Sequence, residues 1–367
     1  MKENRKILGI DASRSAREHP TGVERYSTEI IKALIDENED FEIRLYTPRR
    51  IEGFPEKLQR VLWLPRLWTV VRLSLEMLLH RPDVLFIPSH VLPFFAPRNS
   101  FVTIHDVAFE KYPMAYGAFQ SFYLAWSTRR ALRRAKKVFV PTSAVKEDLI
   151  RYYKCKEGKI VVVHHGCLPI KKINEIQVKA VMNHYQLEKD DPLFLFIGRL
   201  ETKKNLLVLL DAWEIVQKMY SKGRLFLGGM YGHGWGDLFR RMEDHDLQGT
   251  ILSPGYISEE DAAGLFRSAS ALVLPSREEG FGMPILQAFD SECAVICSSI
   301  PTLHEVAGDA ALYSEPGDSE GFAKQMIKIL NDPKLKNELV KKGTLRLKEF
   351  SWKKAADKMM ANFQKTL

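Results

Sequence analysis

Short apolar runs of strand length alternate with helix-like stretches along most of this chain, and the alternation occurs in two series. The runs of the first series are 6–10, 41–46, 84–87, 101–104, 137–140 and 160–163. Those of the second series are 193–197, 224–228, 250–252, 271–274, 294–297 and 311–313. Strands that alternate with helices are typical of parallel sheets covered by helices. The pattern therefore predicts an α/β fold with two mainly parallel sheets.

The length of the chain and a polar stretch in its middle predict two domains. Its 367 residues exceed an ordinary single domain. The segment 168–191 contains Pro169 and ends in a charged run before Pro192, which is typical of a linker that enters a new domain. We therefore predict a boundary near residue 170, with a first domain over 1–170 and a second domain over 171–350.

The last segment, 351–367, has the pattern of an amphipathic terminal helix. Ser351 stands where an N-cap is expected. The apolar residues at helical spacing are Trp352, Ala355, Met359 and Phe363. This spacing predicts one apolar face that packs against a domain core.

The net charge of the chain limits the classes of partner, and the number and spacing of its cysteines indicate the cellular compartment. Lys and Arg outnumber Asp and Glu by 54 to 46, and this net charge of +8 favours an anionic partner: nucleic acid, acidic lipid or a phosphorylated small molecule. The four cysteines form no CxxC pair and stand at no zinc-ligand spacing, so we expect reduced thiols in the cytoplasm and no metal site. No apolar run reaches the length of a signal peptide or a membrane span.

Polar residues follow several strands of the first series, where ligands bind in open α/β sheets. Gly22 ends the loop after the first strand, and a glycine at a helix N-terminus lets backbone N–H groups approach an anion. His105 follows the fourth strand and can donate a hydrogen bond near neutral pH. An ordinary turn and a structural histidine explain these two residues as well. His164 and His165 follow the sixth strand, and we interpret them as structural histidines.

The loop after 193–197 combines a glycine with fixed positive charge. Gly198 permits close approach of a backbone, and Arg199 and Lys204 place cations at the sheet edge and before the next helix. This arrangement suits a diphosphate. The alternative is ordinary solvated surface charge.

The loop after 271–274 places a carboxylate before a helix N-terminus. Pro284 suits the first turn of a helix, and Gly282 exposes backbone at its positive end. Glu279 stands just ahead of that end, which is electrostatically costly unless the carboxylate binds hydroxyl groups. The pattern therefore favours a ligand that is both polyhydroxylated and phosphorylated.

Several motifs resemble those of the retaining nucleotide-sugar glycosyltransferases of family four, in particular their mannosyltransferases. The motifs are IDASR, TGVERY, HDVAFEKYP, VVVHHG, FIGRLETKKNL, EEGFGMPILQAF and SSIPTLHEVAGDAALY. The resemblance implies the GT-B fold, in which two Rossmann-like domains with mainly parallel sheets face a central cleft. It implies that 1–170 binds the acceptor, that 171–350 binds the nucleotide-sugar donor and that 351–367 crosses back to the first domain.

The resemblance also implies roles for individual residues. Arg199 and Lys204 match the pair that binds the donor diphosphate, and Glu279 matches the first glutamate of an E-x7-E motif, which binds the donor sugar. His105 matches a histidine near the reaction centre. Further donor-binding residues are Gly22, Gly198, Phe281, Gly282, Met283 and Gln287. The family usually has a second glutamate, on the nucleotide ribose, where this chain has Gln287.

The function implied is transfer of a sugar, with retention of configuration, from a nucleotide-sugar donor to a glycan or lipid-linked glycan in polysaccharide or glycoconjugate synthesis. The resemblance favours mannose as the sugar and GDP-mannose as its donor, and no metal or other cofactor is expected. One alternative is a nucleotide-sugar epimerase of the same architecture. Another is a non-enzymatic basic protein that binds polyanions, although no nucleic-acid motif is present.

The stretch 61–79 has two interpretations. In one, its apolar residues and the arginines between them form a surface that binds an acidic membrane, which would make the protein peripheral at the inner face of the membrane. The apolar residues are Leu62, Trp63, Leu64, Leu67, Trp68, Val71 and Leu75, and the arginines are Arg60, Arg66 and Arg72. A second basic block lies at 129–137. In the other interpretation, the stretch is a packed helix with a solvated face.

Overall fold

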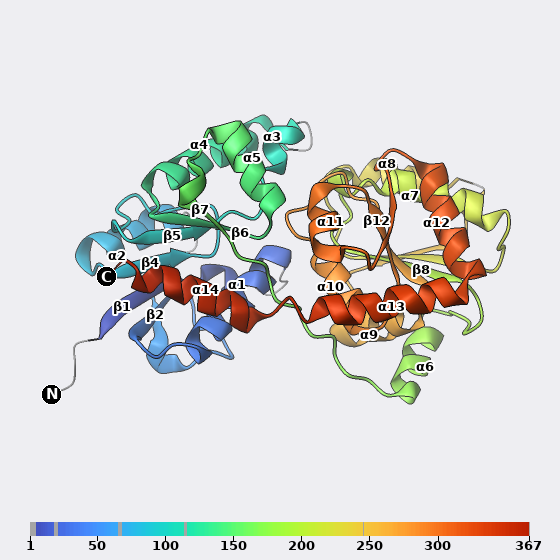
Figure 1. The fold of residues 1–367 in the computed structure, drawn as a ribbon, viewed down its shortest axis with the longest axis horizontal. Coiled ribbons are helices and arrows are strands. Elements are labelled where there is room, and N and C mark those ends of the chain that lie inside the picture. The colour runs from blue at the N-terminus through green and yellow to red at the C-terminus, as the bar shows by residue number, and fades with distance from the viewer. Residues whose placement is uncertain (1–4, 18–20, 65–67, 114–115, 245, 367) are drawn as a thin grey trace. The chain divides into compact units, whose positions relative to one another are not determined.

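The computed structural model describes residues 5–17, 21–64, 68–113, 116–244 and 246–366, and the chain divides into two compact units (Figure 1). Unit 1 comprises Met1–Gly166 and Phe350–Leu367, and unit 2 comprises Cys167–Glu349. The sequence predicted the boundaries at residues 170 and 350.

Unit 1 contains a seven-stranded parallel sheet of order β3-β2-β1-β4-β5-β6-β7. Its strands are β1 (Lys6–Asp11), β2 (Phe41–Thr47), β3 (Gln59–Val61), β4 (Val84–Ile87), β5 (Ser100–Thr103), β6 (Lys137–Val140) and β7 (Ile160–Val162). Each predicted run of the first series corresponds to a strand. The sequence missed β3, because this edge strand has three residues and pairs only with β2.

Unit 2 contains a six-stranded parallel sheet of order β10-β9-β8-β11-β12-β13. Its strands are β8 (Leu193–Ile197), β9 (Arg224–Gly228), β10 (Ile251–Gly255), β11 (Ala271–Leu274), β12 (Val295–Ser298) and β13 (Leu312–Ser314). Each predicted run of the second series corresponds to one of these strands. Both sheets are Rossmann-like, so the predicted fold class is confirmed.

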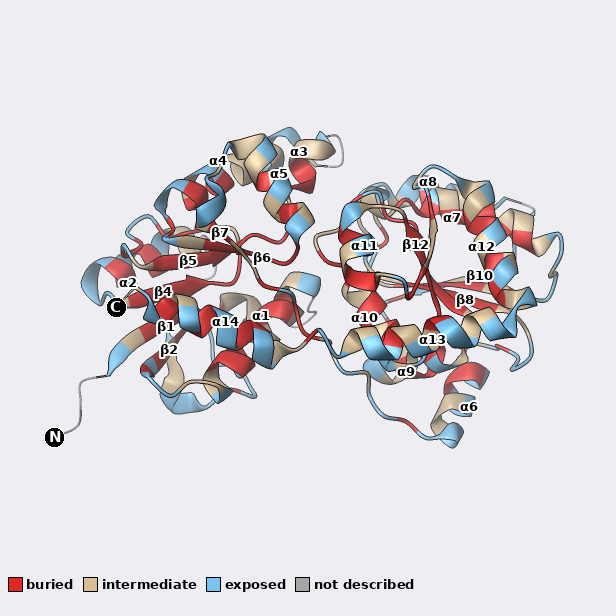
Figure 2. Ribbon diagram, in the orientation of Figure 1, coloured by how far each residue is buried: buried red, intermediate tan, exposed pale blue. Residues whose placement is uncertain are grey.

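Helices cover both sheets. In unit 1 they are α1 (Gly22–Asp36), α2 (Leu73–Leu79), α3 (Ala108–Lys111), α4 (Ala118–Arg134), α5 (Ser143–Tyr153) and α14 (Trp352–Gln364). In unit 2 they are α6 (Glu175–His184), α7 (Leu206–Gln217), α8 (Trp235–Met242), α9 (Glu259–Ser268), α10 (Met283–Asp290), α11 (Pro301–Ala307), α12 (Ser319–Asn331) and α13 (Pro333–Leu347). The strands between these helices are mostly buried (Figure 2), as expected for parallel sheets covered on both faces.

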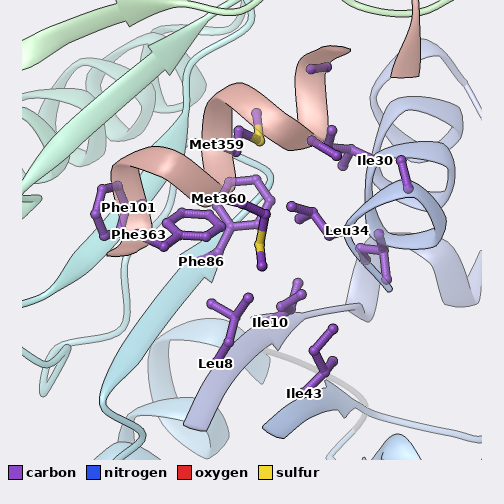
Figure 3. Packing of buried hydrophobic residues seen from close by; sticks show 14 of the residues in the cluster. Leu8, Ile10, Ile30, Leu34, Ile43, Phe86, Phe101, Met359, Met360 and Phe363 are labelled. Carbon is purple, nitrogen blue, oxygen red and sulfur yellow. The ribbon is translucent and has the colours of Figure 1, made fainter. Parts of the chain in front are cut away.

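The C-terminal helix α14 is part of the unit 1 core. Figure 3 shows Met359, Met360 and Phe363 projecting from α14 toward Phe86 of β4 and Phe101 of β5. The rings of Phe101 and Phe363 meet edge to face with centroids 4.8 Å apart, and Phe363 is fully buried. Such aromatic pairs add stability beyond the area that they bury.

The start of α14 packs directly on Gly166. A Cβ atom at Gly166 would lie 2.4 Å from the backbone nitrogen of Trp352, so only glycine permits this close approach. Ser351 occupies the N-cap position that the sequence predicted, but its side chain makes no capping hydrogen bond. Close packing on Gly166 and the apolar face therefore hold the beginning of α14.

The stretch 61–79 is not a continuous helix. After β3 it becomes helical at Trp68, first as a π-helical turn over Trp68–Arg72 and then as α2. The Trp68 indole is buried and donates a hydrogen bond to the Leu62 carbonyl over 2.7 Å. The packed-helix interpretation therefore applies only from Trp68 onward, and the predicted Arg66 and Leu67 lie outside the described residues.

Two of the arginines assigned to a membrane surface pair instead with a buried carboxylate. Glu76 is almost fully buried, with Arg60 Nε at 2.5 Å and Arg72 Nη1 at 3.4 Å from its carboxylate oxygens. A buried carboxylate needs such partners, so these two charges belong to the fold of unit 1. No helix in the described part of the chain is long and apolar enough to cross a membrane.

Candidate active site

The first loop of the candidate site follows β8 and carries two predicted cations. Gly198 continues the strand through a backbone hydrogen bond from its N–H to the Gly228 carbonyl, 2.9 Å long. Arg199 extends into solvent with its side chain 56% exposed, and its Nε lies 3.8 Å from a carboxylate oxygen of Glu201. Over half of this guanidinium side chain is accessible to a ligand. The carboxyl ends of β8 and its neighbours are where a Rossmann-like sheet binds ligands.

Lys204 and Glu279 form the central contact of the site. The Lys204 ammonium donates to Glu279 Oε1 over 2.7 Å, and the Ser276 hydroxyl donates to the same oxygen over 2.7 Å. Both charged side chains are largely buried, with exposures of 15% and 12%. The structure therefore brings together the predicted diphosphate-binding lysine and the predicted sugar-binding carboxylate, which come from loops far apart in the sequence.

Asn205 connects these two loops, a role that the sequence analysis missed. It is buried in the left-handed conformation with φ +59°, and its amide donates to the carbonyls of Pro275 and Pro316. Its side-chain oxygen accepts from Arg277 Nε over 2.9 Å. Asparagine tolerates this backbone conformation better than most residues. The motif KKN immediately before an apolar helix was the available signal.

The N-terminus of α10 lies at the end of the second loop. Gly282 is its N-cap with φ +92°, a conformation that favours glycine, and a proline stands in the first turn. Phe281 is buried, whereas Met283 is partly exposed at the start of the helix. The positive end of α10 therefore follows Glu279 by a few residues, as the sequence predicted, and can stabilise a bound anion.

Gln287 lies in α10 and is partly exposed. Its side-chain amide makes no hydrogen bond with any other residue in the described part of the chain. The side chain of Gln287 is therefore available to a ligand. It lies on α10, the helix whose N-terminus follows Glu279. The carbonyl oxygen of a glutamine accepts hydrogen bonds as a carboxylate does, but without a full charge.

If Gln287 contacts the ribose, replacing it by glutamate is expected to tighten binding of the nucleotide about fivefold, because a carboxylate that accepts hydrogen bonds from the ribose hydroxyls adds charge assistance of about 1 kcal/mol. Isothermal titration calorimetry with GDP measures the change. Gln248→Glu adds the same charge at an exposed position in the loop before β10 and serves as the matched control. Equal affinity of the parent and Gln287→Glu would show that this residue does not contact the ribose.

The predicted Gly22 is the first residue of α1 in unit 1. Thr21 and Glu24 form a capping box at this end, in which the Thr21 backbone N–H donates to Glu24 over 3.2 Å. Burial alone would raise the pKa of Glu24, but the hydrogen bond from Thr21 and the charges of Arg14 and Arg17 lower it. Glu24 is therefore ionised and holds Arg14 in the loop after β1, with 3.4 Å between the charged atoms.

His105 follows β5 and is buried beside α1. Its Nε2 donates to the Pro88 carbonyl over 3.0 Å, and its backbone N–H donates to His90 Nε2. The Tyr26 ring of α1 packs edge-on against it at 4.6 Å. Burial lowers the pKa of His105, so the neutral ring is favoured near pH 7. With the proton on Nε2, the Nδ1 atom carries a lone pair that can accept a hydrogen bond.

His165 is a structural residue, as the sequence indicated. It is buried against Tyr26, His105 and Trp352, with ring centroids 4.4 to 5.9 Å apart. Burial lowers the pKa of His165 well below its usual value, and the neighbouring His105 lowers it further. A neutral imidazole in this position packs α14 onto α1.

No group of three or more His, Cys, Asp or Glu side chains in the described part of the chain could hold a metal ion. The four cysteines are unpaired thiols. Burial raises the pKa of Cys293 to about 12 and that of Cys297 still higher, so neither is a reactive thiolate.

Two family models match the chain. The model described as Glycosyltransferase Family 4 matches residues 20–167, and the model described as Glycosyl transferases group 1 matches residues 178–346. One similar protein is the O-antigen chain mannosyltransferase B of Escherichia coli, 27% identical over 359 residues that cover 90% of this chain and 93% of that protein. Another is the O-antigen chain mannosyltransferase RfbU of Salmonella typhimurium, 27% identical over 64% of this chain and 61% of that protein.

Solved structures show the same fold at lower identity. Sucrose-phosphate synthase from Thermosynechococcus elongatus superposes with a TM-score of 0.77 at 18% identity, covering 98% of this chain and 99% of that one. WaaG, a glycosyltransferase involved in lipopolysaccharide biosynthesis, gives a TM-score of 0.76 at 14% identity, covering 96% and 98%. The predicted architecture of two Rossmann-like domains is therefore confirmed.

Proposed function

The chain belongs to the family-four glycosyltransferases with the GT-B fold, and from this premise we propose that it is a retaining mannosyltransferase that uses GDP-mannose. The proposed acceptor is a glycan or lipid-linked glycan. The observation that carries the proposal is the contact between Lys204 and Glu279 just before the N-terminus of α10. Relatives named as mannosyltransferases support mannose as the sugar, and they favour a transferase over an epimerase.

Lys204 and Glu279 can each bind a different half of a donor. In the structure each charge is the partner of the other. A bound diphosphate offers Lys204 a stronger partner, and the sugar hydroxyls offer hydrogen bonds to the Glu279 carboxylate. The pair therefore suits a ligand that carries phosphate and sugar side by side, which is the chemistry of a nucleotide sugar.

Catalysis then depends on the leaving diphosphate. Negative charge grows on it as the bond to the sugar breaks and the sugar acquires oxocarbenium character. Lys204 and the positive end of α10 stabilise that charge from positions fixed by the fold, and the exposed Arg199 adds a cation from the loop after β8. His105 Nδ1 accepts a hydrogen bond from a substrate hydroxyl in this proposal.

The donor is tested by thermal shift. GDP and GDP-mannose are expected to raise the melting temperature more than UDP, ADP, dTDP and their sugar conjugates at equal concentration. A ligand present at 100 times its dissociation constant adds about 2.7 kcal/mol to the stability of the protein. A larger shift with another nucleotide would reject GDP-mannose as the donor.

We propose that no metal takes part, because Arg199, Lys204 and the positive end of α10 can stabilise the diphosphate charge without one. Addition of EDTA is therefore expected to leave the rate of sugar transfer unchanged. A loss of rate that Mg²⁺ or Mn²⁺ restores would contradict this proposal, and the assay is the release of nucleoside diphosphate.

We also propose peripheral binding to an acidic leaflet through one face of α4. Phe119 and Phe122 are 82% and 70% exposed near the start of this helix. Trp126, Arg129 and Arg133 continue the same face at helical spacing. Exposed aromatic rings followed by arginines suit the boundary between acyl chains and anionic head groups. The stretch 61–79 remains a second candidate for this contact, since Val71 and Leu75 are 51% and 47% exposed.

Flotation with vesicles rich in phosphatidylserine is expected to carry the protein upward at low salt and less at high salt, since screening weakens the charge attraction. The double variant Phe119→Ser/Phe122→Ser is expected to remain at the bottom. Leu345→Ser removes a comparably exposed apolar side chain, 63% exposed, from α13 of unit 2 and is the matched control. Equal flotation of all three proteins would remove α4 from the lipid contact.

A further inference from the structure

Unit 1 contains a cavity of about 570 Å³ at the carboxyl ends of β1, β2 and β4. This volume suits a small-molecule ligand. The side chains that give it its chemistry are Arg14, Arg17, Arg49, Trp63, Trp68 and Tyr123. The cavity is therefore both cationic and aromatic, and none of the residues assigned above to donor binding lines it.

The cationic wall keeps an excess of positive charge. Arg14 and Arg17 both approach Glu24 Oε1, at 3.4 and 3.7 Å, so one buried carboxylate balances two guanidinium groups. Arg49 also lines this wall and donates through Nε to the Ala16 carbonyl over 2.9 Å. Each guanidinium has five N–H donors. Arg14 and Arg17 thus keep donors for an anion in the cavity.

A second carboxyl group, that of Asp11, adds less opposing charge to this wall than an ordinary aspartate does. Asp11 is fully buried at the end of β1, and burial raises its pKa although hydrogen bonds from Ser13 and Thr69 oppose the shift. Thr69 itself lines the cavity. The floor of the cavity therefore offers polar contacts while the wall remains cationic.

The aromatic wall contains one unusually exposed indole. Trp63 is 77% exposed, whereas Trp68 is 8% exposed and held by its hydrogen bond to Leu62. Trp63 lines the cavity, so most of its indole is accessible to a ligand there. The flat face of an indole packs well against the C–H face of a sugar ring, and Tyr123 adds a second ring.

On the basis of the proposed function, we propose that this cavity holds the acceptor and selects one in which a sugar ring adjoins a phosphoryl group. Trp63 contacts the sugar, and Arg14 and Arg17 bind the phosphoryl oxygens. Guanidinium forks match phosphate geometry with paired hydrogen bonds. Arg14 of the DASR motif and the nearby Arg17 thus recognise the acceptor, separately from the donor cations of unit 2.

The test measures binding of small probes to the full chain carrying Arg199→Ala and Lys204→Ala, which removes the donor cations from competition. The probes are mannose 1-phosphate, glucose 1-phosphate, the corresponding methyl glycosides and glucuronic acid, titrated by calorimetry. Arg17→Gln and Trp63→Ala are placed on this background, and both alter exposed side chains. Arg50→Gln is the matched control, because Arg50 is 73% exposed, pairs with Glu56 and does not line the cavity.

The sugar phosphates are expected to bind about tenfold more tightly than the methyl glycosides, and Arg17→Gln is expected to remove most of that advantage. Trp63→Ala weakens both classes of probe, and Arg50→Gln changes neither. Any one of three results would overturn the proposal. These are equal effects of Arg17→Gln and Arg50→Gln, tighter binding of glucuronic acid than of the sugar phosphates, and no binding of any sugar phosphate. These outcomes do not depend on the donor. If the thermal-shift comparison of nucleotides rejects GDP-mannose, the binding of sugar phosphates in the cavity is still expected.

Discussion

Replacing Lys204 by alanine is expected to lower kcat by about two to three orders of magnitude, the usual effect of removing one preorganised group that stabilises developing negative charge. Lys204 is largely buried, and the fold holds its ammonium 2.7 Å from Glu279. Its backbone and side chain are therefore held in place by the fold, and its ammonium exchanges the carboxylate for the diphosphate in the proposed mechanism. Steady-state kinetics with GDP-mannose and an acceptor measure the change.

Neighbouring substitutions separate the role of Lys204 from a general loss of charge. Lys203→Ala removes a cation from the same turn, but Lys203 faces Glu201, at 3.4 Å, and not Glu279. We expect this control to retain kcat within about threefold. Lys204→Arg keeps the charge and should lose less than Lys204→Ala. A kcat for Lys204→Ala close to that of the parent enzyme would remove this residue from the catalytic machinery.

Replacing Phe363 by alanine is expected to lower the free energy of unfolding of unit 1 by about 3 to 5 kcal/mol. Phe363 is fully buried, and its ring contacts those of Phe86, Phe101 and Phe139 with centroids 4.8 to 5.9 Å apart. Truncation removes these contacts and leaves a cavity between α14 and the sheet. Urea denaturation monitored by circular dichroism measures the loss.

Phe119→Ala is the matched control for this loss of stability, because Phe119 is 82% exposed in the same unit. Its cost is expected to stay within about 0.5 kcal/mol. If Phe363→Ala left every unfolding midpoint unchanged, α14 would not be an integral part of the unit 1 core. Loss of kcat with Lys204→Ala and loss of stability with Phe363→Ala should also be independent, since the residues lie in different units.

The sequence predicted the strands well because parallel strands buried on both faces form continuous apolar runs, as in 84–87 and 271–274. It missed β3 because a three-residue edge strand buries too little to leave such a run. The structure of 61–79 was harder to predict than the strands. Its apolar residues recur at a regular spacing, but some are buried in the core, as Trp68 is, and others are exposed to solvent, as Trp63 is. Spacing alone does not distinguish the two.

Residues of the candidate site could be predicted where they belong to a sequence motif. Roles that depend on tertiary contacts could not be predicted. GRL…KKN and EGFGMP identify Lys204 and Glu279, but the distance between them follows only from the fold. The KKN motif marks Asn205, but its contacts with the carbonyls of Pro275 and Pro316 follow only from the fold. Arg60 was predicted to face a membrane because its partner, Glu76, is distant in the sequence.

The most direct measurement is NMR of the reaction with ¹³C-labelled GDP-α-mannose and lipid-linked glycans extracted from cells. We expect the label to appear in an α-linked mannosyl residue on the glycan, with GDP released at a rate that depends on the acceptor. A β-linked product would contradict retention. Labelled free sugar released equally fast without acceptor would contradict transfer and favour the epimerase.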